Sequence, residues 1–304
     1  RDAQESRGLG DVYKRQLMNG ARLGIASQSV GAEQAAYEEA INYARDRKQF
    51  GKEIIHFPAV YDMISRIKAK LDAGRSLLYM TARYVDIYKI LDDISKERKL
   101  TPEERAEYKK YSKMADAFTP LAKGMNSEFA NESAYDSIQV HGGSGFMLEY
   151  KCQRVYRDAR IMSIYEGTTQ LQTVAAIRYI TSGFYANVIQ EYEQEPVAAE
   201  YESYAVRIKD MADKLAFCTN KAKEANNQDF LDLCARKLYE MTAYTIMCHL
   251  LLQDTQRAPE LFSKSLVVFM NYAESEVAKH FNYIHKLDVD PVSYTHLRAH
   301  ETPE

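Results

Sequence analysis

The sequence predicts an all-α protein, with an up-and-down four-helix-type bundle followed by a second, smaller helical bundle. Glycine and proline are scarce, with 13 Gly and 7 Pro among 304 residues, where average usage would give about 21 and 15. No glycine follows Gly183. Sheets need Gly, Asn or Pro at frequent turns, whereas long helices exclude Gly and Pro from their interiors, so this composition favours helices throughout.

The overall composition excludes several classes of protein. Hydrophobic residues make up 46% of the chain and charged residues 27%, with a net charge of −3, which gives no electrostatic reason to expect nucleic acid as a partner. No run reaches 18 apolar residues and no signal peptide is visible, so we expect a cytoplasmic protein without a membrane partner. The four cysteines are widely spaced without a CxxC pattern, which is typical of free thiols in a reducing compartment.

The two ends of the chain lack helical patterning. Residues 1–16, which begin with Arg1, show no apolar periodicity, and residues 292–304 are equally unpatterned. Both stretches resemble translated sequencing-adapter read-through, and ordinary disordered termini are the alternative. We therefore expect two tails, a first helical domain over 17–183, a second over 184–291, and a chain that is a fragment of a longer protein.

The first domain opens with one long predicted helix over 17–47. Gly20 and Gly24, like Gly31 and Ala35, are four residues apart and so lie one turn above each other. Small residues at this spacing predict that another helix approaches closely at these positions.

Two further long helices are predicted. The second follows a break over 51–58 and runs to about Lys96. The third begins at Thr101, which is followed by a proline and two glutamates, a strong helix-start signal. It runs to His141, with Pro120 as a kink or a boundary between two segments, and the glycines that follow end it.

Two shorter helices complete the first domain. One covers about 149–160, and the last reaches Thr181. Thr168 or Thr169 is the expected N-cap of the last helix, and the spacing of Thr169 and Gln172 fits a capping box.

The second domain contains three helical patterns, near 198–225, 228–254 and 259–286. On the last two, apolar residues recur every three or four positions, as on helices that pack against other helices. No candidate site is visible there, so we interpret this domain by itself as structural.

Four segments of the first domain concentrate polar residues and glycine, at 19–22, 47–51, 139–146 and 164–170. Cations followed by glycine, as at 47–51, are also typical of an ordinary helix C-terminus. A glycine-rich loop, as at 139–146, is also typical of a helix cap followed by a turn. Three glycines in four positions nevertheless exceed what a cap needs, and indicate backbone N–H groups presented to a ligand.

Glu166 stands directly before Gly167 and a helix start, where unpaired N–H groups favour anions. Its carboxylate is either a cap stabilised by the helix dipole or a base directed into a cleft. The spacing leaves both interpretations open.

The motifs RDRKQFGK, QVHGGSGF and RDARIMSIYEGTTQLQ, in that order on these elements, resemble the C-terminal helical domain of the acyl-CoA dehydrogenase family over about 17–183. The helices after residue 190 are similar to an extra C-terminal helical domain that one branch of this family carries. The FTPLAK segment around Pro120 is similar to the same branch. The resemblance implies an FAD-dependent enzyme that passes electrons to electron-transfer flavoprotein and acts as a homodimer or homotetramer.

The resemblance also implies roles for individual residues. Glu166 matches the catalytic base, which removes the α-proton of an acyl-CoA thioester while the β-hydrogen leaves as hydride to FAD. Asn19, Arg22 and Gly167 match substrate-binding positions. The remaining matches are contacts to FAD, of which residues 47–49 and 139–143 match positions that hold its adenosine and pyrophosphate across a subunit interface. These positions are Arg47, Lys48, Gln49, Phe50, Gln139, Val140, His141, Gly142, Gly143, Thr168, Thr169 and Gln170.

The same resemblance implies that the family's N-terminal helical domain and middle β-domain lie outside this sequence, so that the chain holds half a site.

Acyl-CoA oxidases and helical DNA-damage-response relatives share these motifs and remain alternatives, as does a non-catalytic helical interaction module. A di-iron site needs two Glu-x-x-His motifs. Only Glu53 and His56 form one, so we expect no metal.

Overall fold

The computed structural model describes the backbone of residues 2–288 and the side chains of residues 19–288; the expected tail at 292–304 lies outside this range. The all-α prediction is confirmed. The α-helices of the described chain are α1 (Asp2–Asp46), α2 (Pro58–Glu97), α3 (Pro102–His141), α4 (Cys152–Met162), α5 (Thr169–Thr181), α6 (Phe184–Glu193), α7 (Glu202–Glu224), α8 (Gln228–Arg257) and α9 (Pro259–Lys286). The short elements are strands β1 (Lys48–Gln49) and β2 (Lys52–Glu53) and the 3₁₀ helices η1 (Ile54–His56), η2 (Gly142–Phe146) and η3 (Ala199–Tyr201).

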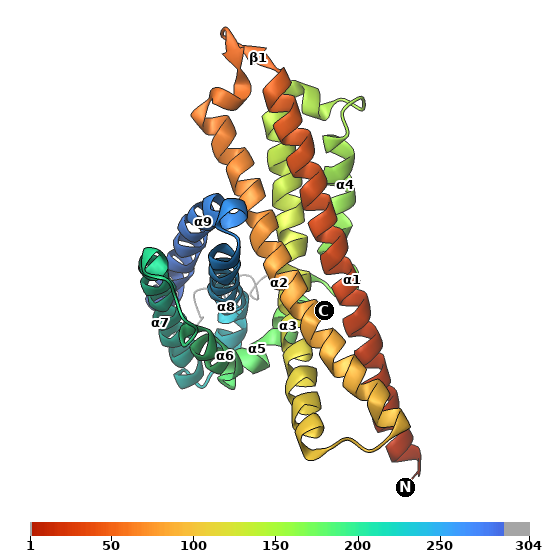
Figure 1. The fold of residues 1–304 in the computed structure, drawn as a ribbon. Helices are drawn as coiled ribbons and strands as arrows, with labels where there is room; N and C mark the ends of the chain where they lie inside the picture. The colour runs from red at the N-terminus through yellow and green to blue at the C-terminus, as the bar shows by residue number, and fades with distance from the viewer. Residues whose placement is uncertain (1, 289–304) are drawn as a thin grey trace, which may run out of the picture.

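Three long helices, α1, α2 and α3, run up and down beside one another, and α4 packs across α1 and α3 (Figure 1). Helix α5 packs against α3 on the side that faces the C-terminal helices. None of the helices within the described range is long and apolar enough to cross a membrane. The four cysteines are buried and free.

Local signals set the ends of α3 as predicted. Thr101 Oγ1 accepts a hydrogen bond from the backbone N–H of Glu104 (3.2 Å), and the Glu104 carboxylate accepts one from the Thr101 N–H (2.9 Å). This capping box satisfies two backbone donors that a helix start leaves unpaired. At the other end, Gly142 takes a φ of +59° after His141. The helix continues through Pro120 rather than ending there.

Helix α1 departs from the prediction in two ways. It begins at Asp2 and so continues through the stretch that we expected to be a tail. The predicted close approach at Gly20, Gly24 and Gly31 is wrong, because these glycines are exposed and a Cβ on any of them would meet no atom within 4 Å.

Close approaches occur instead at Gly74 of α2 and Gly124 of α3. A Cβ on Gly74 would lie 2.2 Å from Oδ1 of Asn126, on α3. A Cβ on Gly124 would lie 2.0 Å from the hydroxyl of Tyr239, on α8. These two glycines therefore let the long helices meet each other and the C-terminal helices.

A short antiparallel hairpin joins α1 to α2, where the sequence predicted only a break. Lys48 pairs with Glu53 and Gln49 with Lys52. Phe50 and Gly51, at the turn, have φ values of +50° and +81°, as expected for a two-residue turn that matches the twist of a hairpin. Gly51 thus serves the hairpin turn and not the end of α1.

The C-terminal helices share one hydrophobic core with the long helices. Buried residues from α1, α2 and α3 belong to the same cluster as those of α5 to α9, and α8 and α9 pack on α2. Helix α6, which the sequence analysis missed, lies just after Gly183. The predicted second bundle therefore exists as helices but does not have a core of its own.

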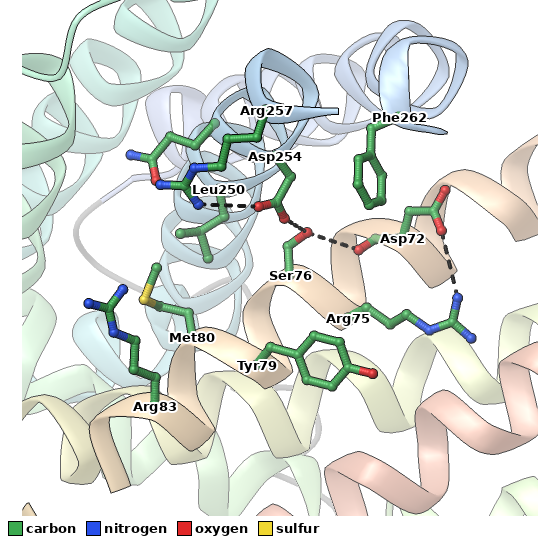
Figure 2. A pocket seen from close by; sticks show the side chains of 11 residues that line it. Asp72, Arg75, Ser76, Tyr79, Met80, Arg83, Leu250, Asp254, Arg257 and Phe262 are labelled. Atoms are coloured by element: carbon green, nitrogen blue, oxygen red, sulfur yellow. Dashed lines mark hydrogen bonds and ion pairs between the residues drawn. The ribbon is translucent and has the colours of Figure 1, made fainter. Parts of the chain in front are cut away.

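Buried polar contacts fix this junction, as Figure 2 shows for the cavity of about 270 Å³ between α2, α8 and α9. Ser76 of α2 donates a 2.6 Å hydrogen bond to Asp254 of α8. Ser265 of α9 donates one of 2.6 Å to Asp72 of α2. Asp72 is buried, and a buried carboxylate without partners is costly. Together the two contacts hold the two groups of helices in one relative position.

Candidate active site

Glu166 and Gly167 form a sharp turn between α4 and α5, with φ values of +54° and +92°. A left-handed conformation costs a residue with a Cβ roughly 1–2 kcal/mol, and such strain persists only where the surroundings hold it. The turn at Glu166 is therefore imposed by contacts from elsewhere in the fold.

Three side chains from three different helices hold the carbonyl oxygens of this turn. Arg22 Nε of α1 donates to the Glu166 carbonyl (3.3 Å). Gln172 Nε2 of α5 donates to the Gly167 carbonyl (3.0 Å), and Lys123 Nζ of α3 donates to the same oxygen (2.8 Å). The N–H groups of Glu166 and Thr168 make no hydrogen bond within the described chain and remain available to a ligand.

Lys123 is a site residue that the sequence analysis missed. Its side chain is 0% exposed, and burial lowers its pKa to about 8, an effect that the carboxylates of Glu128 and Glu166 partly offset. Burial disfavours the charged form of an amine. In the sequence, Lys123 is the single lysine of the segment FTPLAK. The structure shows that the surrounding stretch of α3 is almost entirely buried.

The start of α5 differs from the predicted capping box. Thr168 is the N-cap, and its Oγ1 accepts the N–H of Leu171 (3.3 Å). The hydroxyl of Thr169 is buried and donates to Glu128 of α3. Gln172 has no capping role because its amide reaches back to the turn at residues 166–167.

The predicted substrate-side residues divide into two groups. Arg22 reaches the turn, and burial lowers its pKa while the Glu166 carboxylate opposes that shift. Asn19, one turn earlier on α1, instead donates a 2.6 Å hydrogen bond to Asp116 of α3. The side chains of Glu166 and Gln170 are exposed, so within the described residues nothing covers the carboxylate.

The other predicted cofactor positions lie together at the hairpin end of the bundle (Figure 1). A small apolar cluster that includes Ala44 of α1, Ile54 of η1 and Val140 of α3 joins the hairpin to the end of α3. The side chains of residues 47–50 and of Gln139 are exposed. The structure therefore brings the segments 47–51 and 139–146 together, although Arg47 and Gln139 are 92 positions apart in the chain.

Two predicted cofactor residues at this end have buried side chains. Val140 belongs to the apolar cluster. His141 stacks on Tyr43 with ring centroids 4.2 Å apart, and its Nδ1 donates to the Ser137 carbonyl (2.7 Å). Any contact that these two residues make with a ligand is consequently through the backbone.

The two groups of candidate residues are far apart within one chain. Arg22 supports the Glu166 turn, whereas Arg47 follows the last residue of α1. Because a helix rises 1.5 Å per residue, about 37 Å of helix axis separates these two arginines. One chain thus presents its candidate residues as two separate groups, the two candidate half-sites.

No metal centre is present among the residues that the structure describes, since no three His, Cys, Asp or Glu side chains are placed to share an ion. Glu53 and His56, the single Glu-x-x-His pair, form an exposed contact of 3.5 Å with each other.

Comparison with known proteins gives two family matches. The family described as "Acyl-CoA dehydrogenase, C-terminal domain" matches residues 7–91 and 95–180. A second, described as "Acyl-CoA dehydrogenase C terminal", matches residues 181–292. Together they include every element from α1 to α9 except the first residues of α1 and residues 92–94 of α2.

Curated relatives match about half of the chain. Caffeyl-CoA reductase-Etf complex subunit CarC of Acetobacterium woodii is 38% identical over 169 residues, which cover 54% of this chain and 38% of that protein. An acyl-CoA dehydrogenase of Bacillus subtilis is 30% identical over 166 residues, which cover 55% of this chain and 38% of that protein. The chain therefore spans well under half the length of these relatives.

Solved structures share the fold over more of the chain. An acyl-CoA dehydrogenase from Bacillus anthracis, complexed with FAD, superposes with a TM-score of 0.74 at 20% identity, covering 96% of this chain and 53% of that one. Caenorhabditis elegans ACDH-11 in complex with C11-CoA gives a TM-score of 0.63 at 18% identity, over 84% of this chain and 42% of that one. These likenesses show that the C-terminal helices, too, have a counterpart among known folds.

Proposed function

This chain belongs to the acyl-CoA dehydrogenase family, and from that premise we propose that it supplies the helical side of a flavin-dependent site for α,β-dehydrogenation of an acyl-CoA thioester. The observation that carries this proposal is the strained Glu166–Gly167 turn, whose carbonyls are held by Arg22, Lys123 and Gln172. Such a turn fixes the backbone of Glu166 and so the point from which its carboxylate reaches out, and a base must be positioned in this way at a reacting carbon.

In this proposal Glu166 takes the α-proton of the substrate. Its backbone N–H, free of other acceptors, donates to the thioester carbonyl and stabilises the negative charge that develops there. The exposed carboxylate of Glu166 must be covered to exclude water. Segments that the longer relatives have, and that this chain does not span, would provide that cover.

The donors at the hairpin end fit a phosphate-bearing group such as FAD. A Cβ on Gly142 or Gly143 would meet no atom within 4 Å, so the backbone of this loop is open to close approach. The side chains of Arg47 and Lys48 are exposed and pair with no carboxylate among the described residues. Guanidinium, ammonium and backbone N–H groups are the donors that bind phosphate.

FAD, when bound, supplies the acceptor for the β-hydrogen and its electron pair. The residues of α5, Thr168 to Gln170, lie beside Glu166, whereas Arg47 and Gly142 lie at the far end of α1. Because one cofactor cannot bridge the two half-sites, we assign the hairpin end to the FAD of a second copy. This requires a homodimer or homotetramer in which each site takes residues from two chains.

The electron acceptor in this proposal is electron-transfer flavoprotein. Support comes from the relative that is named as a subunit of a reductase-Etf complex. The names of relatives also favour a second candidate, reduction of an α,β-unsaturated acyl-CoA, because caffeyl-CoA reductase and 3-(aryl)acrylate reductase are 38% and 32% identical to this chain. Both candidates use the same base and cofactor in opposite directions.

The test is anaerobic titration of the full-length protein that contains this chain. Saturated acyl-CoA thioesters should bleach the bound flavin, and Glu166→Gln should abolish bleaching while FAD stays bound. Glu149→Gln, which changes an exposed carboxylate before the other end of α4, is the matched control and should bleach normally. A colourless protein, or bleaching of the Glu166→Gln variant at the unmodified rate, would refute the proposal. Faster turnover of enoyl-CoA by the reduced protein would favour the reductase.

A further inference from the structure

A cleft of about 400 Å³ lies among α6, the segment that follows it, α7 and α8, well away from the Glu166 turn. Ligand pockets of proteins are typically 300–1,000 Å³ and mostly apolar, with a few placed polar groups. An apolar cavity of only about 150 Å³ already holds benzene. The lining residues that matter below are Tyr192, Val197, Val206, His249, Leu252 and Lys209.

Besides the acidic and amide side chains of Glu193, Glu195, Gln253 and Gln256, the lining contains the imidazole of His249, on α8. Its side chain is only 6% exposed, and its Nε2 is buried without a hydrogen-bond partner. Burial lowers its pKa to about 4, so the ring is neutral near pH 7. A buried polar atom without a partner is uncommon in proteins and calls for a specific reason.

The walls of the cleft are apolar and its rim is charged. Val197, Val206 and Leu252 line it together with the ring of Tyr192, whose centroid is 5.7 Å from that of His249. At the rim, Lys209 is already paired with Asp213 (2.7 Å) and lies 3.8 Å from Glu193. This leaves no free cation in the lining to neutralise an anionic ligand.

The cavity of Figure 2 differs in this respect. In the cavity of Figure 2, Asp254 is paired with Ser76 and Arg257, and Asp72 with Arg75. Its two carboxylates therefore have partners within the lining, whereas His249 has an unpaired nitrogen.

We propose that this cleft is a binding site for a small, neutral, hydroxylated apolar molecule, whose hydrocarbon part packs on Val206 and Leu252 and whose hydroxyl hydrogen-bonds to the imidazole of His249. The site is independent of the proposed chemistry at Glu166. It gives the C-terminal helices, which showed no site in the sequence, a role in ligand binding.

The experiment uses phenol, toluene and benzoate as probes, titrated into the 304-residue chain by calorimetry and by NMR of the methyl groups of Val197 and Val206. Phenol should shift these methyls and bind about fivefold more tightly than toluene, the factor expected from one neutral hydrogen bond. Benzoate should bind more weakly than either. Absence of methyl shifts with phenol, or tighter binding of benzoate, would overturn the proposal.

Two variants make the test specific. His249→Leu removes the unpaired polar atom and so should fold; it should bind phenol and toluene equally, and a retained preference for phenol would contradict the proposal. Val206→Trp, at a side chain that is 70% exposed, should fill the cleft and block both probes. Val267→Trp, on α9 and outside this lining, is the control. If phenol and toluene bind equally well to all three variants, the probes bind elsewhere and the proposal is wrong.

Discussion

The ammonium group of Lys123 lies 2.8 Å from the carbonyl oxygen of Gly167, 44 positions later in the chain. This contact joins α3, which packs against α1, α2, α4 and α5, to the turn that presents Glu166. It also explains why a lysine is fully buried. The carbonyl, with Glu128 and Glu166 nearby, gives the buried ammonium the partners that burial requires.

We expect Lys123→Met in the full-length protein to lower kcat by roughly 10²-fold, because small displacements of reacting groups have effects of this size. KM for acyl-CoA and the FAD content should stay within about twofold, since Lys123 is a positioning residue and touches neither in the proposed site. Lys110→Met, at an exposed position of the same helix, is the control. A Lys123→Met enzyme with unchanged kcat would show that the contact does not position Glu166.

The same lysine predicts a pH dependence of stability. Its pKa falls from 10.5 to about 8 on folding, so between these values the unfolded chain binds more protons than the folded chain. The free energy of unfolding contributed by Lys123 therefore rises as the pH increases from 8 to 10.5, by roughly 2–3 kcal/mol. Urea unfolding at pH 7.5 and 10 should show this gain in the unmodified protein and in Lys110→Met but not in Lys123→Met.

Gly167→Ala should destabilise the protein and Gly24→Ala should not. Gly167 has a φ of +92°, and a Cβ there would lie 3.0 Å from Nε2 of Gln172, so we expect a loss of about 1–3 kcal/mol. Gly24 is in an exposed part of α1 with open space around it, where alanine is favoured by up to about 1 kcal/mol. Midpoints of urea unfolding measure both. Equal effects of the two substitutions would contradict the assigned geometry.

A double-mutant cycle tests the junction between α3 and α8. Tyr239 donates a 2.9 Å hydrogen bond to the Pro120 carbonyl, and its hydroxyl occupies the space beside Gly124. Gly124→Ala should lower the free energy of unfolding by about 1–3 kcal/mol through overpacking. In a Tyr239→Phe background, which lacks the hydroxyl, the same substitution should lower it by at least about 1 kcal/mol less. Gly31→Ala, with nothing within 4 Å, is the control. Strict additivity of the two changes would rule out the contact.

Tyrosine contacts of this kind also account for part of the high tyrosine content of 23 residues. Tyr239 donates to the carbonyl of Pro120 in α3, and Tyr185 donates to the carbonyl of Ala117, three residues earlier in the same helix. Tyr84 and Tyr192 join α2 to α6 through their hydroxyls, 3.1 Å apart. A tyrosine buries a large apolar ring and needs one partner for its hydroxyl, so these residues link the two groups of helices.

The sequence by itself determined the motifs and most of the helices, but not α6 or the first part of α1. The helix-start signal at Thr101, the glycine after His141 and the spacing of apolar residues act over a few positions, so they predict where a helix begins, ends and buries a face. Only tertiary structure decided which glycines meet another helix, that Gln172 serves the turn instead of a cap, that the two domains share one core, and that Lys123 supports Gly167. Each of these depends on a partner on another element, and Tyr239 and Pro120, 119 positions apart, have no local signal that links them.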